Sequence, residues 1–406
     1  MASKCKTLNF IDLFSGAGGF TEGFLQASTS ELAFNLLGGS DHQINAEKTY
    51  LGRFRDQLAL DCFFLCKNIR DEDFLDQLKV AIGRNRVDII CGGPPCQGFS
   101  VFGKRNEEDP RNDLFRHYLK VIEALTPKYF IMENVKGLAV MYGGKTVQYI
   151  KDAVANIKGG YKVNGPILVN ATQFGVPQSR ERIIFIGSRE DMPEVPVINP
   201  THPGKPLTLQ DAIGDLAFLK AGESAQKYDS KFNAVSHYQL ERRKGILHRP
   251  PSPCLYNHEA AKHSEQTIQR FALIPVGSGV KEMKSLLKEK GLETAKRWCV
   301  RMRPDAPSYT MVTLPDDFIH YSRNRILTVR EMARIQSFDD SFMFYGPKAT
   351  GGGGVGNKKR NQELPQYTQV GNAVPPLLAK GVALSLGKAY LNPSLYLDEV
   401  VARGGC

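Results

Sequence analysis

The first 189 residues alternate short β-rich runs with stretches of helical periodicity, and this rhythm constrains the fold more than any other feature. Apolar residues recur at helical spacing in Leu114, Tyr118 and Ile122, for example. Strands that alternate with helices are typical of a largely parallel sheet with crossover helices. We therefore predict an α/β fold with helices on both faces of the sheet. Its strands are expected at Leu8–Leu13, Ala33–Gly38, Val87–Cys91, Tyr129–Met132 and Arg182–Ile186.

A change of texture near Asp191 predicts a second domain. Prolines crowd between residues 193 and 206, and no clear rhythm of strands and helices follows them. Thr328-Val-Arg-Glu331 is a capping-box sequence that predicts the start of a helix, and another helix is expected after Pro375-Pro376. The predicted organisation is a first domain at 1–189, a loop-rich domain at 190–326, and a return segment at 327–406 that completes the first domain.

Net charge and cysteine usage narrow the class of protein. Lys and Arg number 53 against 42 Asp and Glu, a surplus of +11 that suits nucleic acid, although many proteins that bind none share it. The eight cysteines include no CxxC pair, which disfavours a zinc ribbon and a dense disulfide framework. There is no signal-peptide pattern and no run of the roughly 20 apolar residues that span a bilayer. We expect a cytoplasmic protein with no membrane segment and no metal site.

A glycine-rich turn follows the first predicted strand. In Phe10-Ile-Asp-Leu-Phe-Ser-Gly-Ala-Gly-Gly19, Gly16 and Gly18 let backbone N–H groups approach a ligand closely. Asp41 stands 23 positions after Gly18, at the end of the next predicted strand, where it can accept the hydroxyl groups of a ribose. The pattern fits NAD and an adenosine-bearing methyl donor equally well. The alternative is a tight turn with an unrelated surface aspartate.

The segment Cys91-Gly-Gly-Pro-Pro-Cys-Gln-Gly-Phe-Ser100 places a cysteine on a rigid turn. Pro94 and Pro95 fix their φ angles directly beyond an apolar strand, so the thiol of Cys96 is expected at the carboxyl edge of the sheet. A thiol there can attack an electrophilic carbon as the thiolate. The alternative is a small buried residue that fills the end of the strand.

Two further segments bring charged groups to the same edge. Glu133 lies at the end of an apolar strand, whose surroundings can keep a carboxylic acid protonated so that it donates to a ring nitrogen. Taken alone, it could equally be an acid at a helix N-terminus. Alternation sends Arg180 and Arg182 to one face, where they could bind a carbonyl oxygen and phosphates. The alternative for this pair is an exposed, charged start of a strand.

In this order, the four segments resemble those of the DNA (cytosine-5) methyltransferases. The family's other motifs are matched by Asp109-Pro-Arg-Asn112 with Leu114, by Thr328–Phe338 and by Gln369–Pro376. The resemblance covers nearly the whole chain. It implies a Rossmann-like S-adenosylmethionine-dependent catalytic and cofactor-binding domain, with 190–326 as the target-recognition domain. The type implied is the stand-alone prokaryotic enzyme of a restriction-modification system.

The resemblance implies a reaction on a cytosine flipped out of duplex DNA at a specific short sequence. Cys96 would add to C6 of the ring while Glu133 binds and protonates N3, so that C5 can take the methyl group of S-adenosylmethionine. Loss of the C5 proton and expulsion of Cys96 would then release 5-methylcytosine. Arg180 and Arg182 would hold the flipped nucleotide.

Binding residues are implied in the same way. Asp41 is expected on the ribose, Asn68 and Ile69 at the adenine amine, and the carbonyl of Pro95 near the exocyclic amine of cytosine. Gln97, Ser100 and Arg111 belong to a segment that resembles the family's mobile lid, and they are expected to contact DNA. The full set expected to bind the cofactor is Phe14, Gly16, Gly18, Asp41, His42, Asn68, Ile69, Pro95, Leu114 and Asn372.

Three features depart from the family's usual pattern. His42 follows Asp41 where a larger aromatic residue is frequent, which weakens the expected stacking on adenine. Asn68 stands where an aspartate is frequent at the adenine amine, and an insertion at Gly351–Arg360 precedes the last motif. None of the three removes a catalytic group.

The sequence leaves two other functions open. An RNA (transfer RNA) cytosine-5 methyltransferase would share the chemistry and differ only in its recognition domain. Basic residues favour DNA there, although charge does not distinguish the two polymers; they are Arg242, Arg243, Lys244, Arg249, Arg301 and Arg303. A non-catalytic DNA-binding regulator would be expected to have lost Cys96 or Glu133. For the methyltransferase, we expect a nucleoid-associated monomer, with a cognate restriction endonuclease that recognises the same sequence as a partner.

Overall fold

The chain forms two compact units in the computed structural model, which describes residues 5–95, 113–245, 255–349 and 363–402. The first unit comprises residues 1–174, 181–203 and 376–406, and the second comprises 175–180 and 204–375. This division differs from the predicted one, because 327–375 belongs to the second unit and the chain returns to the first at Pro376. The reason is that helix α11 (Val329–Ile335) is buried along its whole length and packs with α7 and α13 of the second unit.

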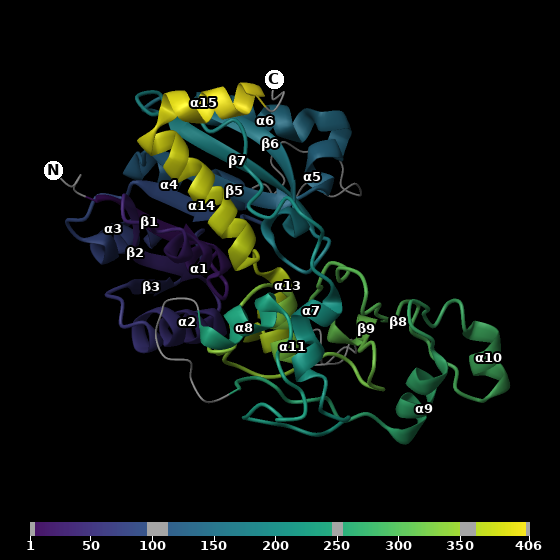
Figure 1. The fold of residues 1–406 in the computed structure, drawn as a ribbon. Coiled ribbons are helices and arrows are strands. Elements are labelled where there is room, and N and C mark those ends of the chain that lie inside the picture. The colour runs from purple at the N-terminus through teal and green to yellow at the C-terminus, as the bar shows by residue number, and fades with distance from the viewer. Residues whose placement is uncertain (1–4, 96–112, 246–254, 350–362, 403–406) are drawn as a thin grey trace. The chain divides into compact units, whose positions relative to one another are not determined.

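A seven-stranded sheet forms the first unit, in the order β3-β2-β1-β4-β5-β7-β6 (Figure 1). All five predicted strands are present. The sequence pattern does not predict β3 and β6, because β3 has only four residues and the Gly165-Pro166 pair interrupts β6. The strands are β1 (Lys6–Leu13), β2 (Leu32–Asp41), β3 (Phe63–Cys66), β4 (Ile89–Gly92), β5 (Tyr129–Val135), β6 (Tyr161–Asn170) and β7 (Glu181–Arg189).

The direction of the strands decides which residues meet at each edge of the sheet. Strands β1 to β5 pair in parallel, so their carboxyl ends lie at one edge. Strand β7 runs antiparallel to both β5 and β6, so its beginning, at Glu181 and Arg182, reaches that same edge. The sheet is therefore mixed rather than wholly parallel, and the predicted α/β Rossmann-like class is confirmed.

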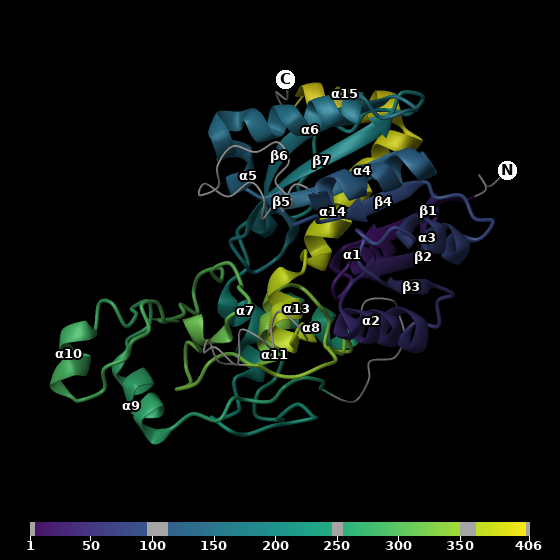
Figure 2. The ribbon, with the colours of Figure 1, turned by 180° about the vertical axis from the view of Figure 1, so that it is seen from behind.

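Helices cover both faces of this sheet, as the opposite views of Figures 1 and 2 show. Helices α1 (Gly19–Gln26) and α14 (Pro376–Leu391) pack together on one face. Their approach requires a glycine, because a Cβ on Gly23 would lie 2.4 Å from the carbonyl oxygen of Pro376. The other face carries α3 (Phe74–Ile82), α4 (Asp113–Leu125) and α6 (Lys145–Ala155), whose apolar residues share a core with the strands. The remaining helices are α2 (Ile44–Leu51), α5 (Gly137–Val140) and α15 (Pro393–Ala402).

The second unit has little regular structure. The side chain of Thr328 accepts from the N–H of Glu331, and the Glu331 carboxylate accepts from the N–H of Thr328, which confirms the predicted capping box. A small apolar core gathers around Phe271 and Leu287. Across the described residues of both units, no helix is long and apolar enough to cross a membrane. The other elements of the second unit are α7 (Leu209–Ile213), α8 (His237–Lys244), α9 (Glu265–Leu273), α10 (Lys284–Glu289), α13 (Gln366–Asn372), β8 (Val300–Arg301) and β9 (Phe318–Ile319).

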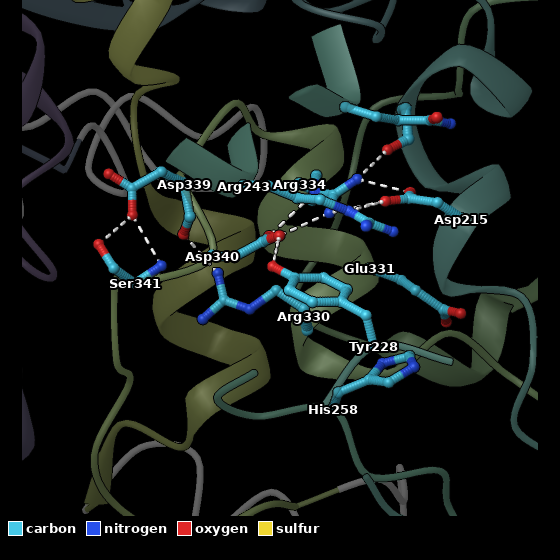
Figure 3. A network of polar contacts seen from close by, with 12 residues as sticks. Asp215, Tyr228, Arg243, His258, Arg330, Glu331, Arg334, Asp339, Asp340 and Ser341 are labelled. Carbon is cyan, nitrogen blue, oxygen red and sulfur yellow. Dashed lines mark hydrogen bonds and ion pairs between the residues drawn. The ribbon is translucent and has the colours of Figure 1, made fainter. Parts of the chain in front are cut away.

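Buried charges connect the loops of the second unit (Figure 3). Arg334 donates to Asp215 at 2.7 Å and to Asp340 at 2.5 Å, and all three side chains are at most 3% exposed. The hydroxyl of Tyr228 donates to Asp340 at 2.5 Å. The guanidinium of Arg330 donates to main-chain carbonyl oxygens, among them that of Asp339 at 2.6 Å. These polar contacts join segments that are far apart in the sequence and that no extended sheet orders.

Candidate active site

Four loops meet at the carboxyl edge of the first unit's sheet. The glycine turn follows β1 and Asp41 ends β2, while the turn at residues 93–95 follows β4 and Glu133 lies near the end of β5. The parallel register aligns the ends of these neighbouring strands. In open α/β sheets, this edge is where ligands bind.

Positive φ angles shape the glycine turn. The angle is 55° at Phe14, 51° at Gly16 and 88° at Gly18. Gly18 also lies against an aromatic ring, since a Cβ there would be 2.5 Å from the ring of Phe54. The N–H of Ser15 donates to the carbonyl oxygen of Ser40 at 3.0 Å, which ties the turn to β2. The backbone of the turn is therefore fixed before any ligand binds.

Asp41 lies directly beside the glycine turn. Its Oδ2 accepts from the N–H of Gly16 at 3.1 Å, and its Oδ1 accepts from the N–H of Gln43 at 3.1 Å. The side chain is 13% exposed, so part of the carboxylate is accessible. The structure thus brings together the acid and the turn that the sequence spacing relates.

His42 stands next to this carboxylate. Its Nδ1 lies 3.3 Å from Oδ1 of Asp41, and its side chain is 60% exposed. The hydrogen bond with Asp41 raises the pKa of His42 above its usual value. An imidazole in this place can present either a neutral or a cationic ring to a stacked base.

Asn68 and Ile69 follow β3, the strand that pairs with the end of β2. The N–H of Lys67 donates to the carbonyl oxygen of Asp41 at 3.0 Å and holds the segment that follows it. Ile69 is 7% exposed and belongs to the core. The amide oxygen of Asn68 accepts from the N–H of Arg70 at 3.1 Å, which fixes the Asn68 side chain on its own turn.

Glu133 and Arg182 form an ion pair across β5 and β7. The antiparallel register sets Glu133 opposite Ile184, two residues from Arg182 on the same face. The Nε of Arg182 donates to Oε1 of Glu133 at 2.7 Å, and the two side chains are 12% and 13% exposed. Gly93 leaves room for the carboxylate, because a Cβ there would lie 3.2 Å from Oε2. An opposite charge at this distance favours the ionised form of a carboxyl group, whereas the expected apolar surroundings would favour the protonated form.

Asn134 connects the proline turn to the strand that carries Glu133. Its Nδ2 donates to the carbonyl oxygen of Pro94 at 3.0 Å, and the residue is 6% exposed. The turn that leads to Cys96 is therefore fixed on β5. The sequence pattern places Asn134 beside Glu133 at the end of a buried strand, but it predicts no role for this residue.

Comparison with known proteins assigns this arrangement to a family. The model of the C-5 cytosine-specific DNA methylases matches residues 8–388. The chain belongs to this family. It is a DNA (cytosine-5) methyltransferase, as the ordered motifs indicate.

Relatives of this methyltransferase are similar along nearly their whole length. The Type II methyltransferase M.DdeI of Desulfomicrobium norvegicum is 36% identical, with 97% of this chain and 92% of the relative covered. The Type II methyltransferase M1.HphI of Haemophilus parahaemolyticus is 35% identical, with 96% and 89% covered. A crystal structure of a prophage-encoded candidate DNA modification methyltransferase (E. coli) shares the fold, with a TM-score of 0.70 at 24% identity over 95% of this chain and 99% of that one.

Several expected site residues of the methyltransferase lie outside the described residues. These are Cys96, Gln97, Ser100 and Arg111, together with the Gly351–Arg360 insertion. Of the other residues expected to bind the cofactor, Leu114 packs partly buried against the core and Pro95 is exposed. Asn372 is exposed at the end of α13, in the second unit. Among the described side chains, no group of three His, Cys, Asp or Glu residues could hold a metal ion.

The structure corrects the expectation that Arg180 and Arg182 share a face. Arg182 belongs to β7 of the first unit, whereas Arg180 belongs to the second unit and is 2% exposed. Side chains alternate between the two faces of a sheet only within a strand, and Arg180 lies outside β7, which begins at Glu181. The guanidinium of Arg180 instead donates to main-chain carbonyl oxygens, at 3.0 Å for Met311, 3.1 Å for Gly371 and 3.3 Å for Ala373.

A buried acid next to the glycine turn escapes the sequence analysis. Asp12, which is 1% exposed, accepts at Oδ2 from the Thr21 hydroxyl at 2.8 Å and from the Thr21 N–H at 3.3 Å. The Thr21 hydroxyl also lies 2.9 Å from that of Tyr50. Burial raises the pKa of Asp12 to about 7. The signal that could have found it is an acid between Ile11 and Leu13, near the end of an apolar strand.

Proposed function

We propose that this enzyme transfers a methyl group from S-adenosylmethionine to C5 of a cytosine flipped out of a specific short sequence in duplex DNA, through a covalent adduct between Cys96 and C6. The observation that carries the proposal is the Glu133–Arg182 pair on the strand that also fixes the turn before Cys96. In this scheme the first unit is catalytic and the second recognises the target. The Type II names of the relatives support a place in a restriction-modification system.

The chemistry of the chain's own groups follows from this arrangement. The Cys96 thiolate forms a bond to C6, the C5=C6 electron pair moves to C4–C5, and the C4=N3 pair takes a proton at N3 from Glu133. S-adenosylmethionine supplies an electrophilic methyl group when bound. C5 then holds both the methyl group and a proton, and N3 shares its electron pair with C4 again. Transfer of the C5 proton to a water molecule leaves the electron pair that forms C5=C6 as the C6–S bond breaks, Cys96 departs as the thiolate, and N3 returns its proton to Glu133.

Arg182 positions the carboxyl group for this proton transfer. Its Nε binds Oε1 of Glu133 at 2.7 Å and so holds the carboxyl group in place beside the proline turn. The ion pair favours the ionised form, so Glu133 would take up a proton from solvent as the base enters. Arg182 would at the same time bind the carbonyl oxygen of the base. This assignment leaves Arg180 out of the proposed substrate site, because its guanidinium binds carbonyl oxygens of the second unit.

The residues around the glycine turn fit S-adenosylmethionine. A Cβ on Gly16 would meet no atom of the described residues within 4 Å, so these residues leave space above the turn. Asp41 offers a partly exposed carboxylate for ribose hydroxyls beside it, and the His42 ring can lie against adenine. Phe14, Gly18, Asn68, Ile69, Pro95, Leu114 and Asn372 complete the proposed set. Gln97, Ser100 and Arg111 are proposed to contact DNA when the segment that holds them closes over the base.

The test is to express the wild type and Cys96→Ala in a methylation-deficient bacterial host and to map 5-methylcytosine in DNA and in RNA. We expect the wild type alone to mark DNA at one short sequence. Cys62→Ala is the matched control, because burial raises the pKa of the Cys62 thiol to about 11 and leaves it protonated. Marked RNA with unmarked DNA would instead identify a transfer RNA enzyme, and a soluble protein that marks neither polymer would indicate a binding role.

A second measurement addresses the covalent step. A duplex with 5-fluorocytosine at the target lacks the C5 proton whose removal releases Cys96, so a stable adduct of enzyme and DNA should accumulate. Mass spectrometry should place the adduct on the peptide that contains Cys96.

The oligomeric state and the role of the methylation need separate measurements. Sedimentation with and without the duplex tests whether the enzyme is a monomer, as proposed. Challenging the marked DNA with endonucleases that cut the same sequence tests whether the methylation protects DNA, as a methyltransferase of a restriction-modification system must.

A further inference from the structure

Three of the five described basic side chains of the second unit that suggested DNA binding are engaged by the protein itself. Arg242 and Arg301 are 7% and 6% exposed and donate to main-chain carbonyl oxygens. Arg243 donates to the buried Asp215 at 2.7 Å. The side chain of Arg303, in contrast, is 58% exposed. Its guanidinium is thus presented to solvent, where DNA can reach it.

Asp305 binds one edge of this guanidinium and leaves the other edge open. The Nε of Arg303 donates to Oδ1 at 3.1 Å and its Nη2 donates to Oδ2 at 2.9 Å. Within the described part of the chain, Nη1 of Arg303 makes no hydrogen bond. The outer edge therefore carries two parallel N–H donors, one each on Nη1 and Nη2, in a fixed orientation. Such a pair matches the two major-groove acceptors of guanine, O6 and N7.

The same ion pair favours a base over a phosphate group as the partner of Arg303. The carboxylate of Asp305 offsets the charge of the guanidinium and repels a phosphate that approaches it. The neutral acceptors of a base edge carry no such repulsion. Arg303 therefore has the electrostatic character of a residue that reads a base rather than one that binds the DNA backbone.

A second Arg–Asp pair shows what is special about Arg303. Arg189 and Asp191 have the same spacing and the same two hydrogen bonds, at 2.6 Å and 2.9 Å. There, however, Nη1 donates to the carbonyl oxygen of Thr126 at 2.8 Å, and the Arg189 side chain is only 15% exposed. The Arg189 pair is closed on both edges, whereas the Arg303 pair is open on one.

The surroundings of Arg303 hold it beside a hollow with an exposed aromatic ring. Gly277, at φ 81°, lies under the stem, since a Cβ there would be 3.5 Å from Cγ of Arg303. The hollow measures about 120 Å³ and lies between Arg303 and Tyr309. The Tyr309 ring is 43% exposed and stacks on Phe318, with ring centroids 6.2 Å apart. A guanidinium and an aromatic ring that both line a hollow can receive the edge of a base.

The segment that carries this hollow is anchored to the chain just before Arg182. The N–H of Ser308 donates to the carbonyl oxygen of Pro177 at 2.9 Å, and the N–H of Ser179 donates to that of Ser308 at 2.8 Å. Ser179 precedes Arg182 by three positions in the sequence. The hollow is therefore anchored by main-chain hydrogen bonds to residues 177–179 of the same unit.

We propose that Arg303 reads a guanine of the recognition sequence, through N–H donors from Nη1 and Nη2 to O6 and N7 in the major groove. The inference rests on the proposed function of the chain. It deepens that function by naming a residue of the second unit that determines specificity and the base that it recognises.

The experiment uses the full-length enzyme and duplexes that carry the methylation sequence mapped for the wild type. Each guanine is replaced in turn by 7-deazaguanine, which keeps O6 and base pairing but lacks N7. For the wild type, we expect kcat/KM to fall about 10-fold or more at one guanine. Arg303→Ala should lose a similar factor on the natural duplex and then be insensitive to 7-deazaguanine at that position. Arg189→Ala, the matched control, should behave as the wild type does.

Asp305→Ala supplies a further measurement. Freed from the carboxylate, Arg303 should bind phosphates, so discrimination at the same guanine should fall while affinity for unrelated DNA rises. The inference is overturned if Arg303→Ala slows methylation equally on all sequences, or if no guanine of the wild-type site responds to 7-deazaguanine. A wild type that methylates no DNA would refute the proposed function itself, before any variant is compared. If Arg303→Ala is unstable, a wild type that responds to 7-deazaguanine at no position still overturns the inference, and the altered discrimination of Asp305→Ala tests the assignment to Arg303.

Discussion

Arg182 donates from Nε to Oε1 of Glu133 at 2.7 Å, although the two residues lie on strands that run in opposite directions. Because β7 is antiparallel to β5, its first residues arrive at the edge where the parallel strands end. A wholly parallel sheet would have placed the beginning of β7 at the opposite edge. The reversed strand β7, the last of the sheet's strands in the sequence, thus adds Arg182 to the proposed catalytic group.

Replacement of Glu133 should impair the chemical step selectively. Glu133→Gln keeps the size of the side chain but cannot transfer a proton to N3, so kcat should fall about 10²-fold to 10⁴-fold. The Kd for S-adenosylmethionine, measured by calorimetry, should stay within twofold of the wild type. Glu181→Gln is the control, because Glu181 is 43% exposed and pairs with Lys136 at the surface. Equal losses in the two variants would contradict the role of Glu133.

Replacement of Asp41 should act on cofactor binding instead. Asp41→Ala removes the acceptor of the Gly16 N–H and the proposed acceptor of the ribose hydroxyls. Hydrogen bonds to a charged acceptor contribute about 1.5 to 3 kcal/mol each, so the Kd for S-adenosylmethionine should rise about 10-fold or more. Calorimetric titration checks this, with the exposed Asp76→Ala on α3 as the control. An unchanged Kd would remove Asp41 from the cofactor site.

The sequence predicts best those parts of the site in which residues at the ends of neighbouring parallel strands contact each other. Gly16 and Asp41 follow neighbouring parallel strands, so their contact is accessible from the sequence pattern alone. Arg180 shows the limit of this reasoning. Alternation along a strand holds only inside the strand, and the carbonyl oxygens that Arg180 binds come from segments more than 130 positions later. The buried charges of the second unit likewise show no sequence periodicity, because partners such as Arg334 and Asp215 come from segments that are far apart in the chain.

Arg180 provides a prediction that separates structure from catalysis. Arg180→Ala leaves three carbonyl oxygens of the second unit without this donor, and each unsatisfied buried group costs about 1 to 3 kcal/mol. We expect the urea midpoint of the second unit to fall clearly, followed by tryptophan fluorescence of Trp298. Arg182→Ala should instead lower kcat and leave this midpoint unchanged. A stable Arg180→Ala variant with a lost kcat would return Arg180 to the substrate site.

The buried carboxyl group of Asp12 should give the stability of the protein an unusual dependence on pH. Burial raises its pKa from 3.8 in the unfolded chain to about 7 in the folded one, so the folded state holds a proton that the unfolded state has lost between these values. Stability is therefore highest at low pH for this group and decreases as pH rises toward 7. Between pH 5 and pH 8, the contribution to the free energy of unfolding should drop by roughly 3 kcal/mol.

Asp12→Asn tests this contribution, because an amide keeps an acceptor for Thr21 and does not ionise. Urea unfolding at several pH values should show a flatter profile for Asp12→Asn than for the wild type. The exposed Asp56→Asn, whose side chain is 59% exposed, should keep the wild-type profile. Parallel profiles for the wild type and Asp12→Asn would show that Asp12 is ionised throughout this range.

Replacement of Arg334 tests how far the stability of the second unit depends on its buried charges. Its replacement by methionine keeps the apolar stem but leaves Asp215 and Asp340 as buried carboxylates without their shared partner. Removing one member of a buried ion pair costs about 3 to 5 kcal/mol, because the remaining charge stays desolvated. Lys290→Met is the matched control, since Lys290 and Glu289 form an exposed pair at 3.2 Å, and its effect on the unfolding midpoint should be small. Thermal and urea unfolding should show a large loss for Arg334→Met alone. If the two variants were equally stable, water or rearranged side chains would be satisfying Asp215 and Asp340, and the network would orient the loops without stabilising them.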